Sequence, residues 1–274
     1  MKYKMAVSDC DNTLIDKNGY LPQDNITAVR KIMERGVEFV IASGRNDLLF
    51  ADFAKEIGGD ISLIGCNGAT IRNLNKNETL RIEPIPKEAL CKIVDFMDKN
   101  GFDYKAYTID RALTKGIEIG DKIRSLTGSY YKNKKDFPYE KIEGGSELKE
   151  LEVLKIVAVY DTKTLSDIQS SLKSVKGVNV VFSSKICLDI VSEKASKGAA
   201  LKFLAEKKGI KPEEIIAFGD TENDLSMLTA AGLSVCMKNG EESLKKLCHM
   251  TTERDNCEAG VAYTLNKIFD LGMY

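Results

Sequence analysis

The feature that most constrains this sequence is a mostly apolar segment, residues 5–8, that ends in two aspartates one residue apart. Asp9 and Asp11 are followed by Asn12 and Thr13. In an extended chain, residues two apart point to the same side, so the two carboxylates can converge at the end of a strand. Carboxylates that close repel each other and raise each other's pKa unless a cation lies between them. Mg2+, a hard cation that binds oxygen, is the ion we expect there.

The same stretch has a second interpretation, in which a strand is followed by an ordinary turn. Asp, Asn and Thr all favour turns, and short motifs of this kind also occur by chance. The choice between a turn and a metal site therefore depends on whether other parts of the chain bring matching residues to the same place.

Strands and helices alternate at the beginning of the chain. Residues 37–42 and 61–64 are nearly continuous apolar runs, as in the buried strands of parallel sheets. The spacing of apolar residues predicts helices after Pro22 and over residues 48–57, and glycines follow both. This order is typical of right-handed βαβ units, so we predict an α/β fold built on a Rossmann-like parallel sheet.

The alternation changes in the middle of the chain. A hairpin, a helix beginning at Pro86 and further strands follow without βαβ crossovers, and the first pattern returns at Lys197. The pattern assigns no elements to residues 110–149, which we expect to shape a substrate pocket. We predict the following domains: an α/β core of residues 1–81 and 186–274, and an inserted α+β cap domain of residues 82–185.

The composition argues against several kinds of function. The chain has 274 residues and a net charge of −1, so it has no strongly basic field to attract nucleic acid or an anionic membrane. The single histidine, His249, lies in an apolar setting, which argues against a histidine metal site or a Ser–His–Asp triad. Seven cysteines without a CxxC pair argue against a disulfide framework and favour a reducing compartment. Since we identify neither a signal peptide nor a membrane-spanning apolar run, we expect a cytoplasmic protein.

Three predicted strands end in polar residues of related type. Besides Asp9, both Ser43 and Asp220 stand at the ends of predicted strands. The carboxyl ends of the strands of an open α/β sheet form one edge, where ligands bind. This edge would gather three aspartates and a serine, with Lys197 as the only cation of the set. Such residues suit phosphoryl transfer, in which Mg2+ and lysine neutralise phosphate oxygens and an aspartate can carry the phosphoryl group.

Each of these motifs also has a purely structural interpretation. Ser43 can cap the helix that follows it, and Asp220 or Thr221 can cap a helix whose first turn contains Asn223 and Asp224. A lysine near a helix start is most often a solvated surface residue. A hydroxyl and free N–H groups at a helix start can, however, also bind phosphate.

Four motifs follow one another in the chain: Asp9-Cys10-Asp11-Asn12-Thr13-Leu14, Ser43-Gly44-Arg45, Lys197-Gly198-Ala199-Ala200-Leu201 and Gly219-Asp220-Thr221-Glu222-Asn223-Asp224. Together they resemble the motifs of haloacid dehalogenase-like phosphatases. The large insertion between the second and third motifs resembles the cap of the Cof-type subfamily, and residues 66–69 and 256–262 are also similar to that subfamily. The resemblance covers nearly the whole chain.

The resemblance implies four catalytic residues. Asp9 would be the nucleophile that takes the phosphoryl group. Asp11 would protonate the leaving alkoxide and then activate the water. Ser43 and Lys197 would hold the phosphate.

The same resemblance implies a Mg2+ site and a rim that touches the substrate. The metal residues would be Asp9, Asp11, Asp220 and Asp224, of which Asp11 contributes its backbone carbonyl. Asp224 and Asn223 would steady the water shell of the ion or Lys197. The rim residues would be Gly44, Arg45, Asn67 and Asn223.

Several positions depart from the family pattern. Asn12 stands where glycine is usual, and asparagine tolerates the left-handed conformation. Cys10 replaces a larger apolar residue. Two late stretches also differ: Lys238-Asn239-Gly240 and Glu258-Ala259-Gly260. These departures concern loop contacts and leave the four catalytic positions intact.

The expected function is Mg2+-dependent hydrolysis of a small phosphorylated metabolite, such as a sugar phosphate or a nucleotide-like phosphate, through an aspartyl-phosphate. Specificity should reside in the cap. A phosphomutase or phosphotransferase would instead return the phosphoryl group to a substrate, and a non-catalytic phosphate-binding protein would keep the site without turnover. A phospho-accepting receiver domain also places acids and a lysine around Mg2+, but it is much shorter and lacks an inserted domain. The sequence identifies neither the substrate nor the oligomeric state.

Overall fold

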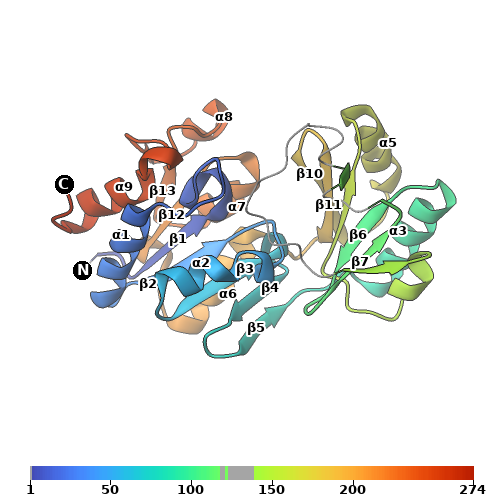
Figure 1. Cartoon of the computed structure of the whole chain (residues 1–274), viewed down its shortest axis with the longest axis horizontal. Helices are drawn as coiled ribbons and strands as arrows, with labels where there is room; N and C mark the ends of the chain where they lie inside the picture. Colours follow the sequence, from blue (N-terminus) through green and yellow to red (C-terminus); the bar gives the residue numbers. More distant parts are fainter. Residues whose placement is uncertain (1, 118–120, 123–138) are drawn as a thin grey trace. The chain divides into compact units, whose positions relative to one another are not determined.

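Two β-sheets organise the computed structural model, which describes residues 2–117, 121–122 and 139–274 (Figure 1). Each sheet lies in its own unit. The first unit comprises residues 2–81 and 196–274, and the second comprises the described residues between 82 and 195. Part of the unassigned region 110–149 lies outside the described residues.

The sheet of the first unit has eight strands in the order β14-β13-β12-β1-β2-β3-β4-β5. Neighbouring strands are parallel from β14 to β3, and β4 is antiparallel to β3. The predicted parallel sheet is therefore confirmed. The strands are β1 Met5–Asp9, β2 Glu38–Ala42, β3 Ile61–Gly65, β4 Thr70–Asn73, β5 Glu78–Ile82, β12 Ile215–Gly219, β13 Leu233–Cys236 and β14 Met250–Thr251.

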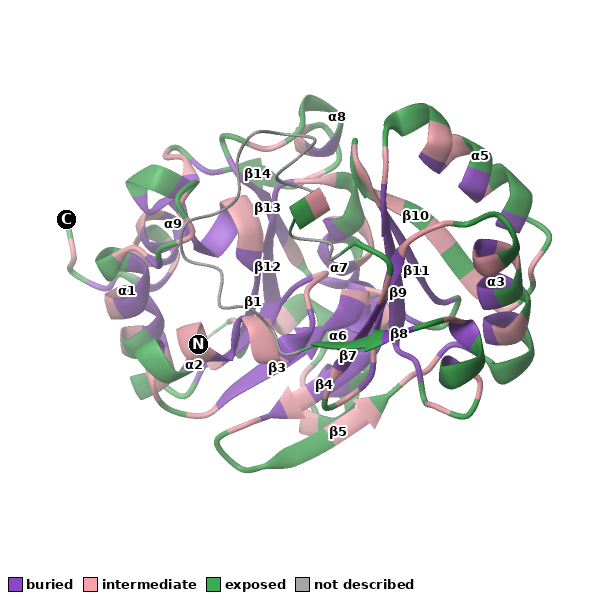
Figure 2. Ribbon diagram, turned by 45° about the vertical axis from the view of Figure 1, so that its right-hand side comes forward, coloured by how far each residue is buried: buried purple, intermediate pink, exposed green. Residues whose placement is uncertain are grey.

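Helices pack on both faces of this sheet, which explains why its central strands are apolar throughout. On β1, Ala6 packs into one apolar cluster, together with residues of α1, α2 and α9. Its neighbours Met5 and Val7 pack into a second cluster with residues of α6 and α7. Figure 2 shows β1 and β12 buried and the outer face of α1 exposed. The helices of this unit are α1 Gln23–Glu34, α2 Ala51–Ile57, α6 Lys197–Lys208, α7 Leu225–Ala230, α8 Glu242–Lys245 and α9 Gly260–Phe269.

The second unit contains a six-stranded sheet in the order β10-β11-β9-β6-β7-β8. One face packs against helices α3 Lys87–Lys99 and α5 Thr162–Leu172 through an apolar cluster that includes Ile156, Leu188 and Ile190. In the described part of the chain, no helix of either unit has both the length and the apolar character needed to cross a membrane. The strands are β6 Tyr104–Tyr107, β7 Ala112–Lys115, β8 Tyr139–Ile142, β9 Lys155–Val159, β10 Val178–Ser184 and β11 Cys187–Ser192.

Strand β11 corrects the predicted second domain boundary. We predicted that the core resumes at residue 186, but β11 pairs with both β9 and β10 in the second sheet. The chain leaves the second unit after Ala195, immediately before α6. The apolar pattern identified the strand but not its sheet, because periodicity carries no information on which partner a strand will join. Strands β7, β8 and β14 were not predicted.

The opposite face of the second sheet is polar and yet buried. Asp189, Val157, Lys105 and Thr114 stand directly opposite one another across β11, β9, β6 and β7, so their side chains share a face. Lys155 lies on the same face, two residues before Val157, and its Nζ is 2.5 Å from Asp189 Oδ2. All five residues are buried. We call the set of Lys105, Thr114, Lys155 and Asp189 the polar face of the second sheet.

Candidate active site

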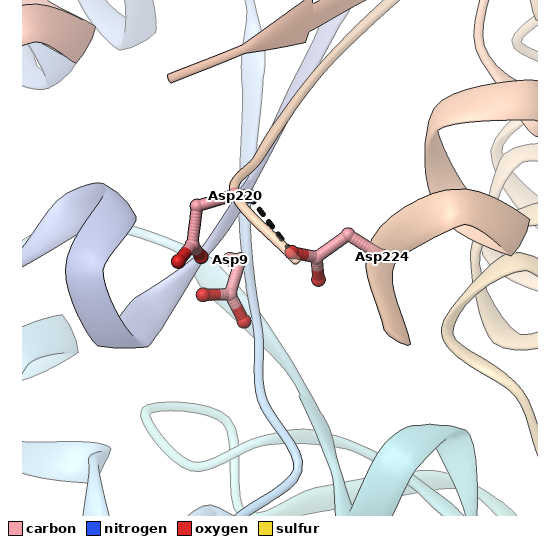
Figure 3. A group of neighbouring side chains, drawn as sticks. All are labelled: Asp9, Asp220 and Asp224. Atoms are coloured by element: carbon pink, nitrogen blue, oxygen red, sulfur yellow. Dashed lines mark hydrogen bonds between the residues drawn. The ribbon is translucent and has the colours of Figure 1, made fainter. Parts of the chain in front are cut away.

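The carboxyl ends of β12, β1 and β2 lie side by side, because β1 pairs in parallel with both neighbours. This order brings together Asp9, Asp220 and Asp224, whose carboxylates each offer an oxygen within 4.8 Å of the others (Figure 3). Asp9 and Asp220 are each 5 % exposed and Asp224 is fully buried. A simple surface turn would leave such side chains in water, so the turn interpretation does not account for this cluster.

Lys197 lies inside the carboxylate cluster. Its Nζ is 2.5 Å from Asp9 Oδ1 and 2.6 Å from Asp224 Oδ1, and the residue is 1 % exposed. The preceding residue, Ser196, caps α6, because its Oγ accepts a hydrogen bond from the N–H of Ala199 at 3.0 Å. The interpretation of Lys197 as a solvated surface residue is therefore wrong.

Asp224 links the lysine to the loop after β12. Its Oδ2 accepts hydrogen bonds from the N–H groups of Asp220 at 2.9 Å and Thr221 at 3.2 Å, while Oδ1 faces Lys197. Asp224 thus stabilises the turn and also orients the lysine. Asn223, in contrast, is exposed and accepts a hydrogen bond from the hydroxyl of Thr221 at 2.6 Å. Asn223 is therefore not part of the buried carboxylate cluster.

Two side chains that sequence reasoning did not assign hold the loops of the site. The Thr13 hydroxyl donates to Asp220 Oδ1 at 3.0 Å. Asn239 donates from Nδ2 to the carbonyl of Asn12 at 2.8 Å, and its own Oδ1 accepts from the N–H of Asn256 at 3.1 Å. Asn12 has a φ of +57°, as expected for an asparagine at a glycine-like position. The late loop therefore supports the first one despite its departure from the family pattern.

Ser43 does not cap the next helix, which corrects that interpretation. Its Oγ accepts a hydrogen bond from the N–H of Arg45 at 3.1 Å, and Asn46 is the capping residue, accepting from the N–H of Leu48 at 3.0 Å. Ser43 is 1 % exposed at the end of β2, next to Asp9 at the end of β1. This position remains compatible with a hydroxyl that binds phosphate.

The loop after β3 packs against the loop after β2 and the start of α6. Asn67 donates its N–H to the carbonyl of Ser43 at 3.1 Å. A Cβ on Gly44 would lie 2.8 Å from Asn67 Oδ1, so these two predicted rim residues are in contact. Gly68 has a φ of +98°, and a Cβ there would lie 2.2 Å from the carbonyl oxygen of Ser196. Only glycine allows this close approach beside Lys197.

Arg45 supplies a second cation to the site. Its Nη2 forms an ion pair with Asp11 Oδ1, and both residues are partly buried. The expectation that Lys197 is the only cation of the set is therefore wrong. The sequence placed Arg45 next to the site but gave no signal for its partner, because the two residues lie on separate loops.

Burial and mutual repulsion shift the pKa values of the cluster. Burial raises the pKa of Asp9 well above its ordinary value, with a further contribution from Asp224 that Lys197 opposes. Burial and Asp224 raise the pKa of Asp220 to about 7, although the Thr13 hydrogen bond acts in the opposite direction. Burial acts to lower the pKa of Lys197, but the carboxylates of Asp224 and Asp9 outweigh it and raise the pKa. The positive charge of Lys197 is therefore not enough to offset burial and mutual repulsion at Asp9 and Asp220.

The charge balance of the site fits a divalent cation. Among the described residues, four aspartates at the site (Asp9, Asp11, Asp220 and Asp224) face the two cations Lys197 and Arg45. Two negative charges remain unbalanced when all six groups are ionised. A set of carboxylate oxygens at this spacing is the type of site that Mg2+ prefers. Asp9 and Asp220 have the oxygens best placed to hold the ion, because both Asp224 oxygens already accept hydrogen bonds.

Comparison with known proteins finds relatives that match nearly the whole chain. The model of a family described as haloacid dehalogenase-like hydrolase matches residues 6–265. The 5-amino-6-(5-phospho-D-ribitylamino)uracil phosphatase YwtE of Bacillus subtilis is 26% identical, with 99% of each chain covered. The putative phosphatase MG265 of Mycoplasma genitalium is 25% identical, with 97% of this chain and 99% of the relative covered.

Solved structures share the fold of both units. A haloacid dehalogenase-like hydrolase from Bacteroides thetaiotaomicron has a TM-score of 0.85 at 28% identity, over 98% of this chain and 100% of that chain. A haloacid dehalogenase-like hydrolase from B. subtilis has a TM-score of 0.84 at 26% identity, over 96% of this chain and 99% of the other. The similarity therefore extends beyond the motifs to the complete architecture.

Proposed function

This chain belongs to the haloacid dehalogenase-like hydrolases, and from that premise we propose that it is a Mg2+-dependent phosphatase that acts through an aspartyl-phosphate. The observation that carries the proposal is the buried cluster in which Lys197 contacts both Asp9 and Asp224 beside Asp220. A nucleophile, a cation for the phosphate and carboxylates for a metal are the groups that phosphoryl transfer needs at one place.

In the first step of the proposed reaction, a carboxylate oxygen of Asp9 attacks phosphorus. The bond between phosphorus and the leaving oxygen breaks, and Asp11 gives its proton to that oxygen. Ser43 and Lys197 donate hydrogen bonds to the transferring phosphoryl group. The products of this step are the free alcohol and the phosphoryl group on Asp9.

In the second step, water attacks the phosphoryl group on Asp9. Asp11, now ionised, takes a proton from the water, and the bond between phosphorus and Asp9 breaks. Inorganic phosphate leaves and the starting protonation states return. The same residue thus serves as acid and then as base, so its side chain needs a position close to both oxygens.

The proposed Mg2+ site supports both steps. Bound Mg2+ would neutralise charge on the phosphoryl oxygens and on the carboxylates. Asp9 and Asp220 would hold the ion through their side chains and Asp11 through its backbone carbonyl, as the family resemblance implies. Asp224 would act mainly on Lys197, because its oxygens accept from that lysine and from the Asp220 and Thr221 N–H groups.

For the substrate, we propose a sugar phosphate or a nucleotide-like phosphate. The name of the B. subtilis relative describes a phosphoribityl group joined to a uracil, which belongs to that class. The second unit would act as a cap that selects the leaving group, and Gly44, Asn67 and Asn223 would form the substrate-facing rim. With seven free cysteines, the protein is expected to act in the cytoplasm.

The test is phosphate release from a broad panel of phosphorylated metabolites, each measured with Mg2+ and with EDTA. We expect release from a subset of sugar or nucleotide-like phosphates that EDTA abolishes. Isomerised product without free phosphate would instead identify a mutase. No release and no isomerisation from any compound, by a folded protein that binds Mg2+, would contradict the proposal and leave a non-catalytic phosphate-binding protein.

A further inference from the structure

We propose that Arg45 positions Asp11 for proton transfer, an inference that rests on the proposed role of Asp11 as general acid and base. The observation is the ion pair between Arg45 Nη2 and Asp11 Oδ1. The two residues lie on the loops that follow β2 and β1, which are neighbouring strands of the first sheet. Both partners of the ion pair therefore lie in the first unit.

Arg45 is held firmly enough to fix a partner. Its N–H donates to Ser43 Oγ at 3.1 Å, and its carbonyl accepts from the N–H of Cys66 at 2.7 Å. The backbone is thus tied to the end of β2 on one side and to the loop after β3 on the other. The side chain is only 14% exposed. A planar guanidinium on a fixed backbone loses little further freedom when it binds a carboxylate.

Asp11, in contrast, needs a constraint on its side chain. It has an extended backbone, with φ −74° and ψ 130°, next to the left-handed Asn12. Its side chain is 32% exposed, whereas the side chain of Asp9 is 8% exposed and held by Lys197. A carboxyl group transfers a proton efficiently only within about 3 Å of the reacting oxygen. The ion pair engages Oδ1, and we assign proton transfer to Oδ2.

The dependence of the rate on the leaving group separates this role from substrate binding. In the first step, the proton of Asp11 passes to the leaving oxygen while the phosphorus–oxygen bond breaks. A 4-nitrophenolate ion leaves without a proton, a phenolate benefits from one, and the alkoxide of benzyl alcohol requires one. A displaced acid therefore slows the 4-nitrophenyl ester least and the benzyl ester most. Loss of a group that binds phosphate instead slows all three esters equally.

The experiment measures kcat/KM for 4-nitrophenyl, phenyl and benzyl phosphate with the wild type, Arg45→Met and Arg45→Lys. We expect Arg45→Met to change the 4-nitrophenyl ester little and to lower the benzyl ester by about tenfold or more, a fraction of what a general acid contributes. Arg45→Lys should restore part of the loss, because it keeps the charge but not the planar fork. An equal loss for the three esters, or no loss for any, would overturn the proposal.

A double-mutant cycle provides the second readout. Asp11→Asn should show the same graded loss, and adding Arg45→Met to it should lower the rates no further, because the arginine then has no acid to position. If the double variant instead showed the product of the two single losses, the proposal would be overturned. A uniform loss in Asp11→Asn would refute Asp11 as the acid. A wild type inactive on all three esters would refute the proposed phosphatase activity. Either result would also remove this inference, and the two results can be told apart.

Arg72→Met is the matched control. Arg72 Nη1 pairs with Asp47 Oδ2 at 3.1 Å in the same unit, and its side chain is 15% exposed, close to the 14% of Arg45. The substitution perturbs a comparable ion pair that does not include a catalytic carboxylate. We expect the ratio of benzyl to 4-nitrophenyl kcat/KM to stay at the wild-type value, and a fall like that of Arg45→Met would overturn the proposal.

Discussion

Each unit of this molecule contains a buried lysine–aspartate pair, and the two pairs differ in their surroundings. Lys197 Nζ lies 2.5 Å from Asp9 Oδ1, and Lys155 Nζ lies 2.5 Å from Asp189 Oδ2. Asp9 stands at the carboxyl end of a parallel strand, beside Asp220 and Asp224. Asp189 stands inside β11, paired on both sides with antiparallel neighbours.

This comparison shows that a buried ion pair does not by itself mark an active site. The catalytic role that we propose for the Asp9 pair rests on its place at a strand end and on the additional carboxylates around it. The strand that carries Asp189 pairs with neighbouring strands on both sides. The Lys155–Asp189 pair therefore lies on the face of a sheet and not on a loop at a strand end. We therefore expect substitutions in the two pairs to have different consequences, one on catalysis and the other on stability.

The largest expected effect is the loss of turnover in Asp9→Asn. Without the nucleophile, kcat should fall by on the order of a thousandfold or more. The fold should remain intact, since the change removes a buried negative charge that Asp224 repels, and Lys197 keeps Asp224 as a partner. Turnover of 4-nitrophenyl phosphate and thermal unfolding test both parts. Residual turnover within tenfold of wild type would contradict the assignment of Asp9.

The matched substitution, Asp189→Asn, should act on stability. Removing one charge of a buried pair typically costs about 3 kcal/mol of unfolding free energy. Denaturant unfolding measures this loss, and 4-nitrophenyl phosphate should still be hydrolysed at close to the wild-type rate under conditions where the variant is folded. A thousandfold loss of that activity in folded Asp189→Asn would remove the distinction between the two pairs.

A smaller effect is the pH dependence of Mg2+ binding. Burial and Asp224 raise the pKa of Asp220 to about 7 in the metal-free protein, so a proton competes with the ion below that pH. Apparent Mg2+ affinity should rise by up to about tenfold per pH unit between about pH 5 and 7 and then level off. Calorimetric titration at several pH values tests this, and Asp220→Asn should remove this component. An affinity independent of pH below about 7 would contradict it.

The raised pKa of Asp220 also determines whether folding stability rises or falls with pH. The folded metal-free protein holds a proton on Asp220 that the unfolded chain releases near pH 4, so the unfolded state binds fewer protons between about pH 4 and 7. The contribution of this group to stability therefore falls as pH rises through that window, and Mg2+ should restore it. Melting temperatures with and without Mg2+ should diverge as pH rises. Curves that converge would contradict the assignment.

The smallest expected effect concerns the loop that carries Asp11. Asn12 has a φ of +57°, which costs an alanine about 1 kcal/mol relative to glycine or asparagine. We expect Asn12→Ala to lower stability by that amount and Asn12→Gly to leave it nearly unchanged. Denaturant unfolding of both variants tests this, and equal stability of the two would show that the conformation is not a constraint.

The sequence predicted the first sheet better than the second for a physical reason. In a parallel sheet, buried strands are continuous apolar runs and functional residues follow directly at their ends, so Asp9, Ser43 and Asp220 could be found from local patterns. In the second sheet, short strands such as β7 and β8 carry mixed residues, and their partners are not encoded locally. The predicted boundary near residue 186 was wrong for this reason.

Contacts between distant loops also could not be predicted from the sequence. The ion pair of Arg45 with Asp11 and the hydrogen bond from Thr13 to Asp220 depend on the three-dimensional position of each loop. Lys197 and Ser43 each had an ordinary surface or capping interpretation, and only burial and partners excluded it. The substrate-facing roles of Gly44, Asn67 and Asn223 and the Mg2+ site remain predictions. For Arg45, the predicted contact with substrate is also untested, and its ion pair with Asp11 leads us to propose a positioning role instead.

The most direct test of the central claim is to identify the residue that carries the phosphoryl group. The protein would be mixed with Mg2+ and 4-nitrophenyl phosphate, quenched in acid during turnover, and its peptides analysed by mass spectrometry after borohydride reduction of any acyl phosphate. Our account predicts a reduced residue at position 9 in the wild type and none in Asp9→Asn. Modification of a different residue, or turnover without any trapped acyl phosphate, would contradict it.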